Sequence, residues 1–264
     1  MPRLPLCKIR IVLMGSPVLL LLLLIGCKAP SNRPTENGNP AQKVTPMSTR
    51  LPNTPMVSGP ITYLALGDST GSGVGAIEGG YVARLFKRIA TRRPGSRLTN
   101  LCFSGATTSD VLRDQLESGV RTNPQLVTLG IGINDIGHYV SLEEFSQNYQ
   151  EILSRLNNNT RATIVITNIP DISSAPQIPV AMRSEYHQRI IEFNGRLAEI
   201  AATHGAIVFD IYTVTHQELP AHPEYFSDDG FHPSDKGYEL WAERMWPTIA
   251  RTIGVDVETT SISR

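Results

Sequence analysis

Four short segments of the chain carry the residue types that nucleophilic catalysis uses. One segment, "GDS", ends at Ser69 and supplies a hydroxyl. A second, "DGFH", runs from Asp229 to His232 and supplies a carboxylate and an imidazole. Two others, "SGA" and "GIND", contain Gly105 and Asn134, which are candidate donors to a developing oxyanion. An activated hydroxyl, an imidazole, a carboxylate and fixed hydrogen-bond donors together favour acyl-transfer chemistry.

The stretch around Ser69 also fits two other patterns. Residues 67–71 read G-D-S-T-G, like the nucleophile elbow of α/β-hydrolases, but that fold places several strands before its nucleophile. Here only a polar segment precedes the first predicted strand. Residues 71–76 read G-S-G-V-G-A, like a dinucleotide fingerprint, which requires an acidic residue near the end of the second strand. No Asp or Glu occurs between Gly79 and Ser109, so both interpretations are set aside.

Short apolar runs alternate with amphipathic stretches through most of the chain. The runs are typical of buried strands and lie at residues 61–66, 97–103, 125–131, 162–169 and 206–211. The amphipathic stretches predict helices at residues 80–92, 107–118, 141–156, 180–203 and 235–252. This alternation predicts an α/β fold, a three-layer doubly wound (flavodoxin-like) sheet of five parallel strands with helices on both faces. Because ligands bind at the carboxyl edge of such a sheet, we expect the four segments to meet there.

In order and spacing the four segments resemble the conserved blocks of the SGNH (GDSL-type) hydrolases, over residues 61–250. The resemblance implies that Ser69 is the nucleophile, His232 its general base, and Asp229 the carboxylate that holds the imidazole. It also implies an oxyanion hole made of the backbone amides of Ser69 and Gly105 and the side-chain amide of Asn134, with no cofactor.

A zinc site is the alternative for the acidic and imidazole side chains late in the chain. The candidate ligands would be Asp228, Asp229, His216, His222 and His232. They show no tight His-x-x-x-His or cysteine-rich spacing, and a metal site would leave the serine segments unexplained, so we predict no metal. The histidines other than His232 are expected to have surface or packing roles.

The chain departs from the commonest form of the family directly after the serine. Thr70 and a glycine-rich stretch, residues 71–80, replace the usual bulky apolar residue. We expect this loop to be mobile and to leave the site open, or to let backbone approach the substrate. The expected substrate is a lysophospholipid-like lipid or an O-acetylated carbohydrate, hydrolysed through an acyl-enzyme. An acyltransferase and a catalytically silent binding module of the same fold are the alternatives.

Residues 1–27 predict a lipoprotein signal peptide. Basic residues precede an uncharged apolar run, residues 11–25, which is shorter than the roughly 20 residues of a membrane span. The run ends in "LIGC", which resembles the bacterial lipobox and makes Cys27 the expected lipidation site. A disordered Pro/Ser/Asn-rich linker (28–60), the hydrolase domain (61–255) and a polar tail (256–264) are expected to follow. The expected location is the bacterial cell envelope, lipid-anchored on its periplasmic or extracellular face.

Charge and cysteine content limit the partners. The formal net charge is +0 and no basic patch occurs, which argues against nucleic acid. Cys7 lies in the predicted signal and Cys27 is the predicted lipid site, so Cys102 cannot form an internal disulfide and is expected to be a buried, inert thiol. We therefore expect a monomer whose partners are its ester substrate and, through the anchor, a membrane.

Overall fold

The computed structural model describes residues 59–256. The expected signal peptide with Cys27, nearly all of the expected linker and all but the first residue of the expected tail lie outside the described residues. Within the described range, no helix is long and apolar enough to cross a membrane.

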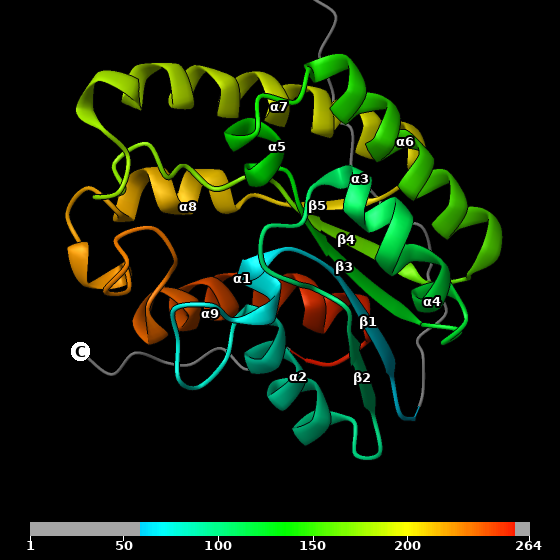
Figure 1. Cartoon of the computed structure of the whole chain (residues 1–264). Coiled ribbons are helices and arrows are strands. Elements are labelled where there is room, and N and C mark those ends of the chain that lie inside the picture. Colours follow the sequence, from blue (N-terminus) through cyan, green and yellow to red (C-terminus); the bar gives the residue numbers. More distant parts are fainter. Residues whose placement is uncertain (1–58, 257–264) are drawn as a thin grey trace, which may run out of the picture. The chain divides into compact units, whose positions relative to one another are not determined.

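Five parallel strands form one sheet in the order β2-β1-β3-β4-β5 (Figure 1). Their bounds are β1 (Thr62–Gly67), β2 (Arg97–Asn100), β3 (Leu126–Gly130), β4 (Thr163–Thr167) and β5 (Ile207–Phe209). Gly67 pairs with Gly130, and Gly130 pairs with Thr167, so three central strands end side by side at the carboxyl edge. The prediction of a doubly wound, flavodoxin-like sheet is confirmed.

Two predicted strands are shorter than expected. β2 ends at Asn100, although the backbone of Phe103 still donates a hydrogen bond to Gly67 of β1. β5 ends at Phe209 because the next residue, Asp210, caps a helix by accepting a hydrogen bond from the amide of Thr213. Both ends therefore turn the chain at the edge where the site is expected.

Helices cover both faces of the sheet (Figure 1). The long helices are α2 (Tyr81–Arg92), α6 (Leu142–Asn159), α7 (Arg183–His204) and α9 (Asp235–Thr252). The shorter ones are α1 (Ser69–Ser72), α3 (Thr108–Asp110), α4 (Leu116–Val120), α5 (Ile133–Gly137) and α8 (Ile211–Glu218). Single turns complete the set: the π-helical η1 (Val111–Gln115) and the 3-10 helical η2 (Val180–Met182) and η3 (Pro223–Tyr225). The predicted helix at residues 107–118 is thus α3, η1 and the start of α4 in succession.

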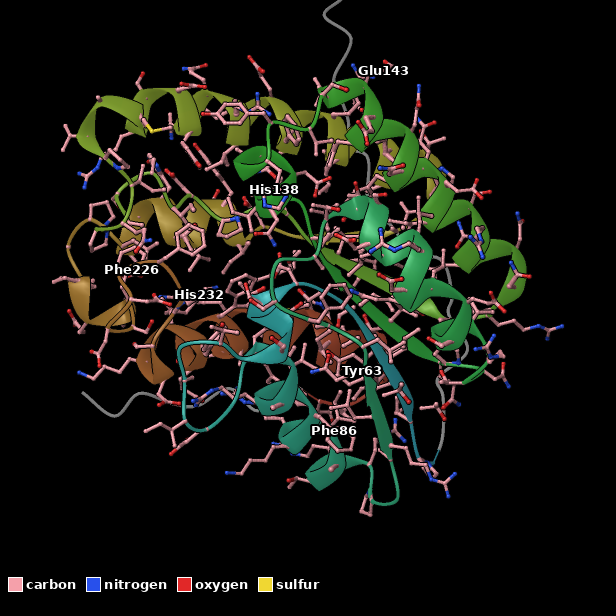
Figure 2. All side chains as sticks on the ribbon, viewed as in Figure 1. Tyr63, Phe86, His138, Glu143, Phe226 and His232 are labelled. Atoms are coloured by element: carbon pink, nitrogen blue, oxygen red, sulfur yellow. The ribbon has the colours of Figure 1, made fainter. Side chains whose placement is uncertain are left out.

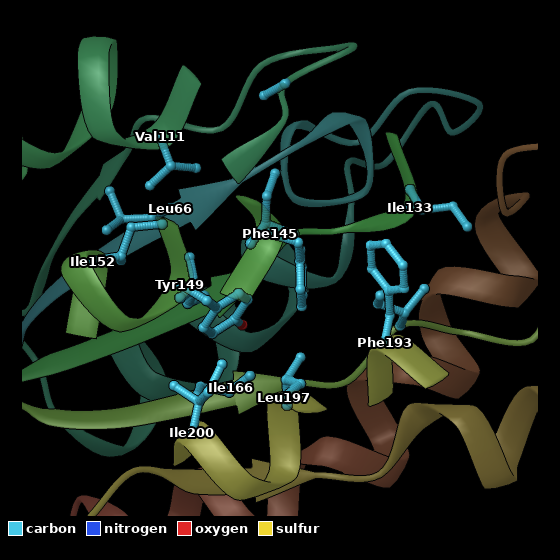
Figure 3. Close-up of a cluster of buried hydrophobic side chains, with 14 of the residues drawn as sticks. Leu66, Val111, Ile133, Phe145, Tyr149, Ile152, Ile166, Phe193, Leu197 and Ile200 are labelled. Atoms are coloured by element: carbon cyan, nitrogen blue, oxygen red, sulfur yellow. The ribbon is translucent and has the colours of Figure 1, made fainter. Parts of the chain in front are cut away.

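The two faces of the sheet pack against different helices. Along β1, Leu64 and Leu66 belong to one apolar cluster, whereas Tyr63 and Ala65 belong to the other, as the alternation of a strand requires. The first cluster is closed mainly by α6 and α7, whose side chains meet over the sheet in Figure 3. The second is closed by α2 and α9, where Tyr81 and Trp241 stack at 4.8 Å between ring centroids. Buried on both faces, the sheet gives its carboxyl edge a rigid base.

Candidate active site

Ser69 is the first residue of α1, two residues beyond the last residue of β1. Gly67 has φ 150, and a Cβ there would lie 2.2 Å from the carbonyl oxygen of Gly130, so only glycine allows this approach of β1 to β3. Asp68 then caps α1, its Oδ1 accepting a hydrogen bond from the amide of Thr70 at 2.9 Å. This turn holds Ser69 at the carboxyl edge, where the residue is 3% exposed.

His232 and Asp229 lie in the loop between η3 and α9, and Figure 2 shows His232 beside α1. The Nε2 atom of His232 is 2.9 Å from the Oγ atom of Ser69. Its Nδ1 atom is 2.6 Å from the Oδ2 atom of Asp229. The structure therefore brings the three predicted catalytic residues into one hydrogen-bonded chain.

The second oxygen of Asp229 is saturated by its own loop. Oδ1 accepts hydrogen bonds from the amides of Phe231 and His232, at 2.8 and 2.9 Å, and from the hydroxyl of Ser227 at 2.9 Å. Burial raises the pKa of Asp229, but the bonds from His232 and the loop amides outweigh it and hold the pKa well below its usual value. Asp229 is thus a carboxylate at neutral pH, with one oxygen left for the imidazole.

The three predicted oxyanion donors follow the carboxyl ends of β1, β2 and β3. The amide of Ser69 is the first of a helix, and such amides have no carbonyl partner within the helix. Asn134, in α5, donates from Nδ2 to the carbonyl oxygen of Ala106 at 2.8 Å, which leaves its second N–H for a ligand. Gly105 adopts φ 81, a backbone conformation that favours glycine. The bond to Ala106 thus joins Asn134 to the segment that holds Gly105.

Two buried carboxylates hold the loops of this edge together. Asp135 accepts hydrogen bonds from the amide and hydroxyl of Thr108, which ties α5 to α3. Burial raises the pKa of Asp135 to about 6, although the bonds from Thr108 lower it in part. Burial likewise raises the pKa of Asp68, against the opposing effects of the bonds from Thr70 and of His232. Neither carboxylate is hydrogen-bonded to Ser69 Oγ, and both order the loops that position it.

Residues 65–240, which include all four segments, match the GDSL-like lipase/acylhydrolase family. The chain belongs to this family. The resemblance to SGNH (GDSL-type) hydrolases is confirmed, and the protein is an ester hydrolase.

Named relatives agree with this assignment. The chain is 28% identical to the spore germination lipase LipC of Bacillus licheniformis over 211 residues, which cover 70% of this chain and 94% of the lipase. A lipase/acylhydrolase from Enterococcus faecalis shares its fold with TM-score 0.59 and 23% identity, covering 72% of this chain and 95% of that one. An acetylxylan esterase from Geobacillus stearothermophilus matches with TM-score 0.62 and 20% identity, covering 76% and 98%. The two solved structures show the fold that this hydrolase shares with them.

The glycine-rich stretch of the hydrolase differs from the expected open loop. Its first residues form α1, and Gly75 lies against the loop between η3 and α9, residues 226–234, which carries His232 and is called the catalytic loop below. A Cβ on Gly75 would lie 2.8 Å from the carbonyl oxygen of Pro233 and 2.9 Å from the Cβ of His232. The glycine backbone therefore approaches the loop that carries His232. The sequence led us to expect an open loop or a close approach of this backbone to the substrate, whereas the structure places the backbone against the enzyme's own loop.

Side chains of α9 fasten this stretch. The carboxylate of Asp235 accepts hydrogen bonds from the amides of Ile77 and Glu78 at 3.1 and 2.9 Å. The hydroxyl of Tyr238 donates to the carbonyl oxygen of Val74 at 2.8 Å. Sequence reasoning missed both residues, because only the topology places α9 beside residues 74–78. Their position in the first residues of the helix that follows "DGFHPS" was the one available signal.

A small apolar cavity opens beside Ser69 and His232, with a volume of about 40 Å³. Figure 2 labels Phe226 and His232, both on its wall. Its apolar lining consists of Ile133, Pro170, Ile172, Ile211, Val214, Leu219, Tyr225, Phe226, Phe231, Pro233, Leu240 and Trp241. At about 10–15 Å³ for each water-sized group, it has room for roughly three. These wall residues come from several loops and helices, which explains why no sequence pattern marked them.

The set considered as a zinc alternative does not come together. Asp229 contacts His232, and His232 contacts Ser69, whereas His222 contacts Glu224 with its Nδ1 atom at 3.2 Å. Asp228 is exposed. His216 lies instead with Asp171 and His187, a combination that the spacing in the sequence does not suggest. Cys102 is half-buried, and burial raises the pKa of its thiol above the usual value, as expected of an inert thiol.

Proposed function

We propose that this hydrolase is a serine esterase that forms an acyl-enzyme on Ser69. The observation that carries the proposal is the chain of hydrogen bonds from Ser69 Oγ through His232 to Asp229, at 2.9 and 2.6 Å. His232 takes the hydroxyl proton as Oγ attacks the ester carbonyl carbon, and it returns that proton to the leaving alcohol. Water then attacks the acyl-enzyme with the same imidazole as base, and the acid is released.

The same relatives support these roles. Solved structures of the Geobacillus acetylxylan esterase include catalytic mutants in which a serine, an aspartate or a histidine is replaced by alanine. In that enzyme the aspartate stands three residues before the histidine, as Asp229 stands before His232. Asp229 holds the imidazole with Nδ1 protonated and Nε2 facing the serine, and its negative charge stabilises the imidazolium.

The oxyanion of the tetrahedral intermediate would be bound by three donors. In this proposal they are the backbone amides of Ser69 and Gly105 and the side-chain amide of Asn134. The support is their arrangement: a helix N-terminal amide, a glycine amide presented at φ 81, and an amide group already fixed by Ala106. Fixed donors of this kind need no reorganisation when the charge develops.

The cavity favours a short acyl group. Its walls are apolar, and space for roughly three water-sized groups corresponds to the carbons beyond the carbonyl of a butyryl ester. A long fatty acyl chain would have to displace side chains such as Phe231 and Leu219 from the wall. We therefore propose acetyl to butyryl esters, and O-acetylated carbohydrates before lysophospholipids, as the substrate class. The acetylxylan esterase, a relative in fold, acts on a substrate of this kind according to its name.

The decisive experiment replaces the proposed nucleophile. Ser69→Ala should reduce hydrolysis of p-nitrophenyl acetate by roughly 10⁵- to 10⁶-fold, because no other group can form the acyl-enzyme. The matched control is Ser72→Ala in the same helix, whose hydroxyl donates only to the carbonyl oxygen of Ser69, at 3.0 Å, and which should stay within about tenfold of the wild type. Wild-type activity in Ser69→Ala, or labelling of another residue by a fluorophosphonate, would overturn the proposed triad.

A series of p-nitrophenyl esters tests the substrate class separately. We expect kcat/KM to be highest between acetyl and butyryl and to fall at least about tenfold by octanoyl, since excess carbons must distort a packed wall. A kcat/KM that rises through octanoyl and beyond would assign the enzyme to long-chain lipids and leave the proposed triad intact.

We also propose, from the sequence alone, that Cys27 is lipid-modified and tethers the enzyme to a bacterial envelope membrane. The support is the basic start, the apolar run and the "LIGC" segment. Cys27→Ala should move the protein from the membrane fraction to the soluble fraction after cell lysis. Retention of this variant in membranes would overturn the tether.

A further inference from the structure

A second group of imidazole and carboxylate side chains lies outside the proposed triad. Asp171 follows β4, His187 belongs to α7, and His216 belongs to α8. The Nδ1 atom of His216 is 2.8 Å from Asp171 Oδ2, and the Nδ1 atom of His187 is 3.2 Å from the same oxygen. Two imidazoles from different helices thus converge on one carboxylate oxygen.

The carboxylate is held in place from both sides. Its Oδ1 atom accepts a hydrogen bond from the amide of Ser173 at 3.0 Å, and the backbone amide of Asp171 donates to Thr215 Oγ1 at 2.8 Å. The Asp171 side chain is 5% exposed. Burial raises the pKa of Asp171, but the hydrogen bonds from His216 and Ser173 lower the pKa by more. The pKa therefore lies below its usual value, and Asp171 is ionised at neutral pH.

The imidazoles are ordered but reachable from solvent. The rings of His187 and His216 stack at 5.6 Å between centroids, and Tyr212 stacks on His216 at 5.7 Å. The two histidine side chains are 30% and 55% exposed. They border a cavity of about 330 Å³ whose wall also includes Arg183 and Ser184. An ion and its water ligands can therefore enter.

The ligand atoms are close enough for one ion. One ligand atom from each of the three residues lies within 4.8 Å of the others. Tetrahedral zinc, with bonds of about 2.0–2.1 Å, separates its ligands by roughly 3.3 Å, so the observed 2.8 and 3.2 Å need to open by only a few tenths of an ångström. Two nitrogens and one carboxylate oxygen suit zinc and its first-row neighbours, whereas calcium and magnesium prefer oxygen ligands throughout.

We propose that Asp171, His187 and His216 form a binding site for one divalent first-row transition-metal ion, with water from the adjoining cavity as the remaining ligand. The site is separate from the proposed triad, since none of its three ligands is hydrogen-bonded to Ser69, Asp229 or His232. It joins the segment after β4 to α7 and α8. Pro170 and Ile172, the neighbours of Asp171, line the acyl cavity, so the ion braces that wall without touching the substrate.

Zinc binding by the full-length chain tests the proposal. The protein is prepared without a histidine tag, stripped with a chelator and titrated with ZnCl₂ in a calorimeter. We expect one saturable equivalent per chain and, at a free zinc concentration of about 100 times Kd, a rise in Tm of roughly 5–10 °C. MgCl₂ at the same concentration should leave the Tm unchanged.

Variants locate the ion. His187→Gln and His216→Gln keep the side-chain bulk, and each should weaken zinc binding by roughly 10- to 100-fold. The matched control is His204→Gln, in the same helix as His187 but outside the cluster, which should bind like the wild type. Circular dichroism shows whether each variant is folded, and Asp171→Asn provides a third variant with the same expectation. Absence of saturable binding, or full binding by the double variant His187→Gln/His216→Gln, would overturn the proposal.

Discussion

Two groups in this protein combine a carboxylate with imidazole, and they differ in what lies on the far side of the ring. Asp229 takes one imidazole, and the opposite nitrogen of His232 meets the hydroxyl of Ser69. Asp171 takes two imidazoles on one oxygen, and those rings border a cavity of about 330 Å³. The residue types are the same in both groups, yet only the first group has a nucleophile.

The surroundings of each carboxylate determine which chemistry its group can support. The Oδ1 atom of Asp229 accepts hydrogen bonds from amides of its own short loop. The carboxylate and the imidazole of His232 are therefore held by the same loop. Asp171 is linked to two separate helices, so its group can join elements, but neither of its imidazoles is hydrogen-bonded to a serine hydroxyl. Proton transfer is favoured in the first arrangement, and metal binding in the second.

The largest contrast should come from removing each carboxylate charge in turn. Asp229→Asn is expected to lower kcat for p-nitrophenyl butyrate by about 10³- to 10⁴-fold, because the imidazole loses its preferred tautomer and its counter-charge. Asp171→Asn should lower kcat by less than about tenfold and weaken zinc binding instead. Equal losses of kcat in the two variants would contradict the assignment of catalysis to Asp229 and of metal binding to Asp171.

The next largest effect concerns the oxyanion donors, which only the first group possesses. Asn134→Ala should lower kcat by about 10²- to 10³-fold with little change in KM, because the lost hydrogen bond forms in the transition state. Asn157→Ala is the matched control, since this exposed side chain on α6 donates only to the carbonyl oxygen of His204 at 2.9 Å. A KM effect alone would show that Asn134 contacts the ground state of the substrate instead.

A smaller effect should follow from displacing the catalytic loop. Gly75→Ala places a methyl group 2.8 Å from the carbonyl oxygen of Pro233, at a backbone φ of 92, and should lower kcat/KM by about 10- to 100-fold. Gly195→Ala, within α7 and with nothing within 4 Å of the added Cβ, should leave activity unchanged and stabilise the protein by about 0.5–1 kcal/mol. Full activity of Gly75→Ala would mean that the loop adapts without moving His232.

The smallest effect is expected from zinc itself. Zinc-loaded and chelator-treated enzyme should differ less than about twofold in kcat for p-nitrophenyl acetate, while their Tm values differ by several degrees. Stopped assays at matched ionic strength, together with a thermal melt of each sample, measure both quantities. A large loss of kcat on chelation would show that the second group takes part in catalysis after all.

The sheet and the meeting of Ser69, His232 and Asp229 could be predicted well from the sequence, because both depend on local signals. The apolar runs needed only adjustment at their ends, as at β5, where the cap of α8 stops a run that would otherwise continue to residue 211. Asp229 and His232 are three residues apart, so one loop contains both, and Ser69 follows directly from the first strand. The helices α1, α5 and α8 were missed because four to eight residues carry little periodicity.

What the sequence could not predict depends on distant packing. Asp171, His187 and His216 have no motif spacing and meet only because the segment after β4, α7 and α8 share one end of the sheet. The glycines of residues 71–80 were visible, but the loop against which Gly75 packs was not. The walls of the acyl cavity come from segments between residues 69 and 241 and are defined by the same long-range contacts.

The hydrogen bond between Ser69 and His232 spans 163 residues of chain. It joins the turn after the first strand of the domain to the loop before its last helix, so the other four strands of the sheet lie between Ser69 and His232 in sequence. A growing polypeptide therefore cannot form the proposed triad until nearly all of the domain has been synthesised. Recovery of ester hydrolysis after dilution from denaturant would consequently measure how fast these two distant segments come together during folding.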